Sequence, residues 1–173
     1  MYFCYVKQKG FRNNVRKRII QKSLKNNKRS IVFPSLDLIR TIGIVKEIDI
    51  GFDFSTKRLT GNSRLVFLNL TRDKIDDKPD ENLISLANLN FWGLPAKAII
   101  ESFVSEPFDL LINFIGFENN AVDLIFAKSK AKFKAGTTLS ACNCDLIIDQ
   151  QIFDGSLFID ELEKAFSNFN TPN

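Results

Sequence analysis

One segment, Phe108–Ile115, constrains the fold of this chain more than any other part of the sequence. It reads Phe-Asp-Leu-Leu-Ile-Asn-Phe-Ile and is almost continuously apolar. A strand with one face in water alternates apolar and polar residues, whereas a strand covered on both faces has apolar residues at successive positions. The segment therefore predicts a central strand of a parallel sheet that is covered on both sides.

The rest of the chain alternates between strand and helix patterns, which predicts helices on both faces of that sheet. The further strands that we expect are Thr41–Ile48, Arg64–Leu70, Leu89–Trp92, Lys130–Ala135 and Asp145–Asp149. We expect one helix that begins after Pro95 and two others at Ala121–Ala127 and Ser156–Asn168. Only 15 residues separate the first two strands, so the helix between them must be short or irregular. These elements predict a three-layer, Rossmann-like α/β fold with a mostly parallel sheet.

The N-terminal segment differs sharply in charge from the rest of the chain. Residues 1–30 contain ten Lys or Arg and no acidic residue, a net charge of +10. Residues 31–173 contain fourteen Lys or Arg against twenty Asp or Glu, a net charge of −6. Apolar residues at helical spacing predict an amphipathic helix from about Phe11 to Asn27. We therefore expect a basic amphipathic N-terminal helix within residues 1–30 and a single α/β domain over residues 31–173.

Such a segregated positive charge is typical of a surface for a polyanion, because Lys and Arg neutralise phosphates. The cations that we assign to an RNA-binding surface are Arg12, Arg16, Lys17, Arg18, Lys22, Lys25, Lys28 and Arg29. Two other interpretations of this helix stay open. It docks onto its own acidic domain, or it binds an anionic membrane with Tyr2, Phe3 and Tyr5 at the interface.

A second basic feature is the predicted strand Lys130–Ala135, in which alternation places Lys130, Lys132 and Lys134 on one face. A central strand of a covered sheet cannot bury three ammonium groups, so we expect an edge strand or one that opens onto solvent or a ligand. At an edge, lysines discourage pairing with other sheets. On an open face, these lysines, followed by Gly136 and Thr137, would contact phosphates as a second RNA contact or as a site for a phosphorylated ligand.

Several kinds of chemistry find no support in the sequence. The chain has no histidine, which removes the commonest general base and most zinc sites. Neither glycine-rich phosphate-binding motif is present, and the acidic residues from Asp73 to Glu81 lack the spacing of a calcium loop. We therefore assign no catalytic residue, no cofactor and no metal. No motif for specific DNA recognition is present, and no pattern indicates an oligomeric state.

The cysteines and the N-terminus help to predict the cellular compartment of the protein. Cys4, Cys142 and Cys144 do not form a paired disulfide framework, which is typical of a reducing compartment. The N-terminus has positive charge but no apolar segment that would make it a secretory signal. We expect a cytoplasmic protein.

From the first strand onward, the chain resembles an uncharacterised bacterial family, a domain of unknown function. The residues that carry this resemblance are Thr41–Val45, Phe108–Asn113, Lys128–Gly136 and the closing Phe158–Phe166 helix. More distantly, Phe108–Gly136 looks like the late part of a Rossmann-like N-terminal domain of sugar-transferring enzymes. The resemblance implies a fold but brings no known active site.

Together, these patterns favour a non-catalytic binding protein that associates with RNA or the ribosome through its basic N-terminal helix. An alternative is a small-molecule enzyme or sensor that binds a phosphorylated ligand on a Rossmann-like sheet. A second alternative is a peripheral membrane protein.

Overall fold

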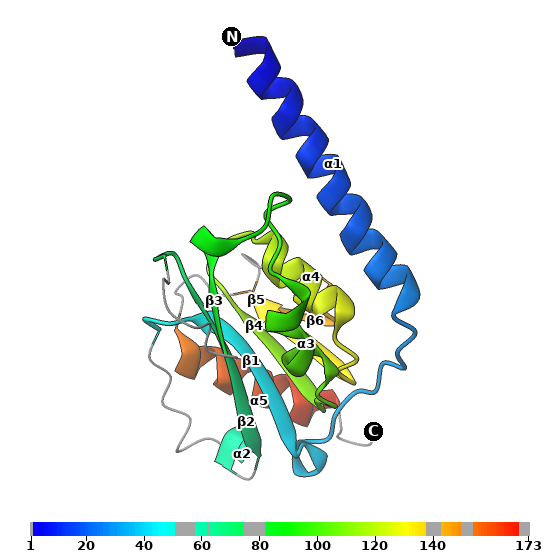
Figure 1. Ribbon diagram of the computed structural model, residues 1–173. Coiled ribbons are helices and arrows are strands. Elements are labelled where there is room, and N and C mark those ends of the chain that lie inside the picture. Colours follow the sequence, from blue (N-terminus) through cyan, green and yellow to red (C-terminus); the bar gives the residue numbers. More distant parts are fainter. Residues whose placement is uncertain are drawn as a thin grey trace.

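The computed structural model describes residues 2–50, 58–61, 63–74, 82–137, 143–149 and 154–169. Its centre is a six-stranded sheet in which every pairing is parallel and the strand order is β3-β2-β1-β4-β5-β6 (Figure 1). The strands are β1 (Thr41–Glu47), β2 (Arg64–Thr71), β3 (Leu83–Ser85), β4 (Leu110–Phe114), β5 (Phe133–Thr137) and β6 (Leu146–Ile148). The order reverses between β1 and β4, as in doubly wound Rossmann-like folds. The predicted fold class is confirmed.

Helices cover both faces of the sheet. They are α1 (Tyr2–Asn26), α2 (Arg58–Gly61), α3 (Lys97–Ser105), α4 (Asn120–Lys128) and α5 (Gly155–Phe169). The α3 and α4 helices pack on one face, whereas α2 and α5 pack on the other (Figure 1). In the described part of the connection between β1 and β2, the one helix is the four-residue α2, in line with the short separation of these strands. Within the described residues, none of the helices combines the length and apolarity needed to cross a bilayer.

The strand β4 lies at the centre of the core, as its apolar run predicts. All five of its residues are buried. Successive side chains of a strand point to opposite faces, so Leu111 joins the core under α3 and α4, while Leu110 and Ile112 join the core under α5. In this second core, the ring centroids of Phe114 and Phe158 are 5.5 Å apart. The sheet is therefore covered on both faces.

The expected strand at Leu89–Trp92 is wrong. The third strand is Leu83–Ser85, and a short 3-10 helix, Leu86–Asn88, follows it directly. Residues 90–93 instead form a turn, because the Asn90 side chain accepts hydrogen bonds from the backbone N–H groups of Trp92 and Leu94. Gly93 completes this turn with φ +68°, a conformation that favours glycine.

The expected edge strand at Lys130–Ala135 is also wrong. The strand β5 begins at Phe133 and pairs with β4 on one side and β6 on the other. It is an interior strand, and all five of its residues are buried, including Lys134. Lys130 and Lys132 precede the strand and are exposed.

Candidate nucleic-acid interface

The helix α1 lies against α4. Its apolar residues Ile19, Ile20 and Leu24 pack against the core beneath that layer. At its N-terminal end, the helix extends past the rest of the described structure (Figure 1). The helix therefore has an inner face fixed on the α/β domain and an outer face that points away from it.

Two arginines hold the middle of the inner face on the turn at residues 90–93. Arg16 Nε donates a hydrogen bond to the carbonyl oxygen of Trp92. The guanidinium of Arg12 lies over the ring of Phe91, with its central carbon 4.0 Å from the ring centroid. A guanidinium offers several donors and a flat face, so it suits both contacts. Arg12 and Arg16, which we assigned to RNA from the sequence, thus make contacts within the chain.

Side chains at and just after the C-terminal end of α1 also bind the domain. Asn27 Nδ2 donates to the carbonyl oxygens of Ala127 and Ser129, at 2.9 and 2.7 Å. These carbonyls lie at the end of α4, where a helix lacks internal donors. Arg29 Nη1 donates to the carbonyl oxygens of Ala131 and Lys132, and its Nη2 pairs with the carboxylate of Asp145. Arg29 also acts within the chain.

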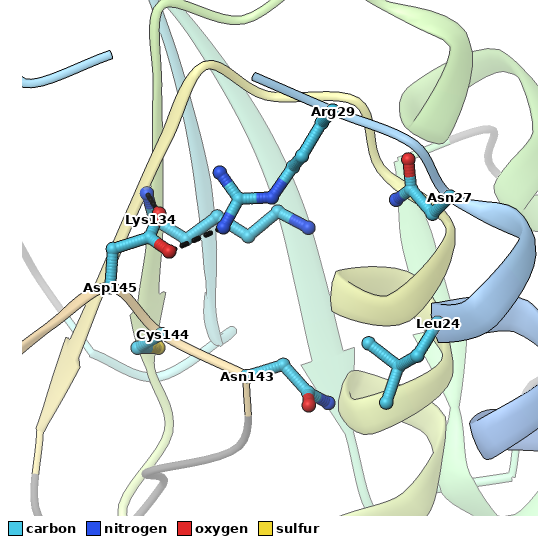
Figure 2. Close-up of a pocket in the computed structure, with 7 residues that line it drawn as sticks. All are labelled: Leu24, Asn27, Arg29, Lys134, Asn143, Cys144 and Asp145. Carbon is cyan, nitrogen blue, oxygen red and sulfur yellow. Dashed lines mark hydrogen bonds and ion pairs between the residues drawn. The ribbon is translucent and has the colours of Figure 1, made fainter. Parts of the chain in front are cut away.

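A pocket of about 240 Å³ opens where these contacts meet (Figure 2). Its lining residues come from α1 and the segment after it, from β5 and from the segment before β6: Leu24, Asn27, Arg29, Lys134, Asn143, Cys144 and Asp145. Burial raises the pKa of the Cys144 thiol to about 12, and the negative charge of Asp145 adds to this shift. A thiol with this pKa is almost entirely protonated at neutral pH and is a poor nucleophile or metal ligand.

The structure does not place Lys130, Lys132 and Lys134 on one exposed face. Lys134 is 2% exposed, and its ammonium donates to the carbonyl oxygen of Phe126 in the last turn of α4, where a positive charge is favourable. Lys132 is 61% exposed, and its ammonium lies 2.7 Å from Asp109 Oδ1. Lys130 is exposed. The expectation of three exposed lysines is wrong, because the strand starts after Lys132 and a helix end receives the buried ammonium of Lys134.

The same geometry separates the residues of the expected phosphorylated-ligand site. Thr137 ends β5, whereas Lys130 and Lys132 precede its start. Five strand residues span about 16 Å, so Thr137 and Lys132 lie at opposite edges of the sheet. Among the described residues, no group of three or more Cys, Asp or Glu side chains is placed to hold a metal ion.

Asp109 joins three segments at the amino-terminal edge of the sheet. Its carboxylate accepts hydrogen bonds from the backbone N–H groups of Arg40 and Thr41 and from the ammonium of Lys132. Burial alone would raise the pKa of Asp109. The hydrogen bonds from Lys132, Arg40 and Thr41 outweigh burial and hold the pKa below its usual range. Asp109 is therefore a structural anion rather than a proton donor.

The N-terminal segment carries five further cations among those assigned to RNA. Lys17, Arg18, Lys22, Lys25 and Lys28 are exposed. Arg18, Lys22 and Lys25 follow helical spacing and share one side of α1. No ion pair joins any of the five to a described acidic residue. We call these five residues the outer cations.

An exposed aromatic cluster lies on the same part of the molecule. Phe11 on α1 is 62% exposed, and Phe91 in the turn is 64% exposed. The ring of Trp92 lies 6.2 Å from that of Phe11 and 5.0 Å from that of Phe91. This cluster was not predicted, because Leu89–Trp92 was expected to be a strand and phenylalanine is usually buried. The Asn-Phe-Trp-Gly order of residues 90–93 was the available indication of a turn.

Comparison with known proteins gives one match. The model of a family of unknown function, DUF6913, matches residues 12–168. This range includes the docked part of α1 and every strand of the sheet. No curated protein and no solved structure matches the chain.

Proposed function

Because the chain belongs to DUF6913, a family of unknown function, we propose its function from its own surface: it binds RNA through the outer cations of the N-terminal helix. One observation carries this proposal. The inner arginines are used to hold α1 on the domain, whereas the outer cations have no described acidic partner.

The charge of the outer cations is poorly compensated nearby. Residues 1–30 hold no acidic residue. Arg18 and Lys25 are about 10 Å apart along the helix axis, with Lys22 between them on the same side. Such a row of cations attracts a phosphate chain and gains free energy when the counterions of the RNA are released. Because docking fixes the helix on the domain, its orientation does not have to be ordered when RNA binds.

The same packing argues against the two other interpretations of this helix. A helix that binds a membrane surface inserts its apolar face, but Ile19, Ile20 and Leu24 of α1 pack against the domain. Docking onto the domain explains the inner arginines but gives the outer cations no role. Docking therefore accounts for the inner face, and RNA as a partner would give the outer cations a role.

The segment before β5 extends this basic surface. Arg29 donates to the carbonyl oxygens of Ala131 and Lys132, which places this segment beside the end of α1. Lys130 and Lys132 are exposed there. We include Lys130 as a second RNA contact and leave out Lys132, whose ammonium pairs with Asp109, and Lys134, which is buried.

The test measures the affinity for a labelled RNA hairpin with single-stranded ends by fluorescence anisotropy. The variant Arg18→Gln, Lys22→Gln, Lys25→Gln should bind more weakly by about 10-fold or more, because three phosphate contacts are lost. A control variant of equal charge, Arg64→Gln, Lys74→Gln, Lys164→Gln, changes exposed positions outside α1. Equal affinities of the two variants would contradict the proposal.

A further inference from the structure

We propose that the aromatic cluster of Phe11, Phe91 and Trp92 stacks on unpaired bases, so that the RNA recognised by this protein is single-stranded at this point. The inference rests on the proposed RNA-binding function and specifies its substrate class. Exposed rings beside cations are the combination that single-strand binders use, because rings stack on bases while cations hold the phosphates.

Among the described phenylalanines, only Phe11, Phe91 and Phe169 are more than half exposed. Phe103, Phe108, Phe126, Phe158 and Phe166 are all buried in the two cores. Phe11 and Phe91 are instead 62% and 64% exposed, although they come from segments far apart in the sequence. Each ring lies beside Trp92, so residues from two segments form one exposed aromatic cluster. A cluster of exposed apolar side chains on a protein surface is typical of a binding site.

The turn that carries Phe91 and Trp92 is held in place by contacts within the chain. The Arg12 guanidinium lies over the ring of Phe91, and Arg16 binds the carbonyl oxygen of Trp92. Asn90 Oδ1 accepts the backbone N–H of Trp92 at 2.9 Å, which fixes the turn. Bases would therefore meet rings that are already positioned, and little side-chain freedom would be lost on binding.

The cluster is continuous with the outer cations. Phe11, Arg18, Lys22 and Lys25 are separated by seven, four and three residues, so all four lie on one side of α1. Phe11 is about 10 Å from Arg18 along the helix axis. A single strand can thus place its phosphates along the cations and its bases on the rings at the N-terminal end of the row.

A duplex cannot use this arrangement in the same way. In a paired helix, the faces of the bases are covered by their neighbours, so they are not free to stack on side chains. The inference therefore predicts that single-stranded RNA binds more tightly than duplex RNA of the same length. Stacking on one base contributes about 10-fold or more in affinity.

The test compares a short oligouridylate with a duplex RNA of equal length. The variant Phe11→Ala, Phe91→Ala should lose about 10-fold or more in affinity for the single strand and little for the duplex. The matched variant Phe11→Tyr, Phe91→Tyr keeps both rings and should bind like the wild type. Trp92 is the only tryptophan of the chain, so single-stranded RNA should quench its fluorescence directly.

Each outcome has a clear meaning. Loss of single-strand affinity in the alanine variant, rescue by tyrosine and quenching of Trp92 support the inference. Unchanged single-strand affinity in the alanine variant overturns it, while the proposed function stands if the variant without Arg18, Lys22 and Lys25 still loses affinity. Binding to vesicles with anionic lipids, but to neither RNA, overturns both and identifies the rings as membrane contacts.

Discussion

Arg29 forms an ion pair with Asp145, which lies 116 residues later in the chain. This contact connects the segment after α1 to the segment before β6. The two segments lie far apart in the sequence. Asp145 also accepts the backbone N–H of Lys134 on β5. The position of the basic helix thus depends on a contact that neither segment could indicate alone.

Breaking this pair should destabilise the protein. Both side chains are mostly buried, so Arg29→Ala and Asp145→Ala should each lower the free energy of unfolding by about 2 kcal/mol. A double-mutant cycle followed by urea unfolding should give a clear coupling energy. The exposed Lys97–Glu101 pair serves as the control, where little coupling is expected. Equal coupling in the two pairs would contradict a structural role for Arg29.

Gly93 should tolerate no side chain. A Cβ at Gly93 would lie 2.8 Å from Arg16 Nη2, and its φ of +68° is unfavourable for other residues. We expect Gly93→Ala to lower the free energy of unfolding by about 1–2 kcal/mol. At Gly61, a Cβ would meet no atom within 4 Å, so Gly61→Ala should change stability by less than about 0.5 kcal/mol. Similar thermal unfolding of the two variants would argue against this packing of Arg16.

Asp109 should contribute to stability in a pH-dependent way. Its pKa is lowered in the folded state, so its contribution is fully present above the unfolded pKa, about 4, and is lost as the pH falls through the folded pKa. Asp109→Asn should cost about 1 kcal/mol at pH 7. This difference from the wild type should shrink below about pH 4 in urea unfolding. Asp73→Asn, at an exposed position, is the control. A difference that stays constant with pH would contradict the ionised contacts of Asp109.

Cys144 should be unreactive at neutral pH. Burial raises the pKa of its thiol to about 12, so the thiolate that reacts with alkylating agents is scarce. We expect iodoacetamide at pH 7.5 to modify the Cys144 peptide far more slowly in the folded protein than in urea, as measured by mass spectrometry. Modification at the same rate in both states would show that the pocket around Cys144 is open and the thiol is not desolvated.

The sequence predicted what local patterns determine. The apolar run at Phe108–Ile115 predicted a doubly buried strand, because burial on both faces leaves no polar alternation. The burial of Lys134 was not predictable in this way, because the acceptor for its ammonium, the carbonyl of Phe126, belongs to the preceding helix. A pattern of alternating lysines reports spacing and carries no information about such a partner.

The residues of the candidate site were also only partly predictable from the sequence. Composition predicted the positive charge of the N-terminal helix. It could not show that Arg16 contacts the domain whereas Lys22 is exposed. Arg16 contacts the domain through the carbonyl of Trp92, which lies 76 residues later in the chain. Trp92 is in a turn, where a strand was expected. The exposed ring of Phe91 escaped prediction for the same reason, since phenylalanine is usually buried.

The central claim, that the outer cations bind the phosphates of RNA, is tested most directly by the salt dependence of binding. The slope of log K against log salt concentration should become shallower by about 2 in the variant Arg18→Gln, Lys22→Gln, Lys25→Gln, because each lost contact with a single strand removes about 0.7. It should stay unchanged in the control variant Arg64→Gln, Lys74→Gln, Lys164→Gln. The same slope in the wild type and both variants would contradict the account.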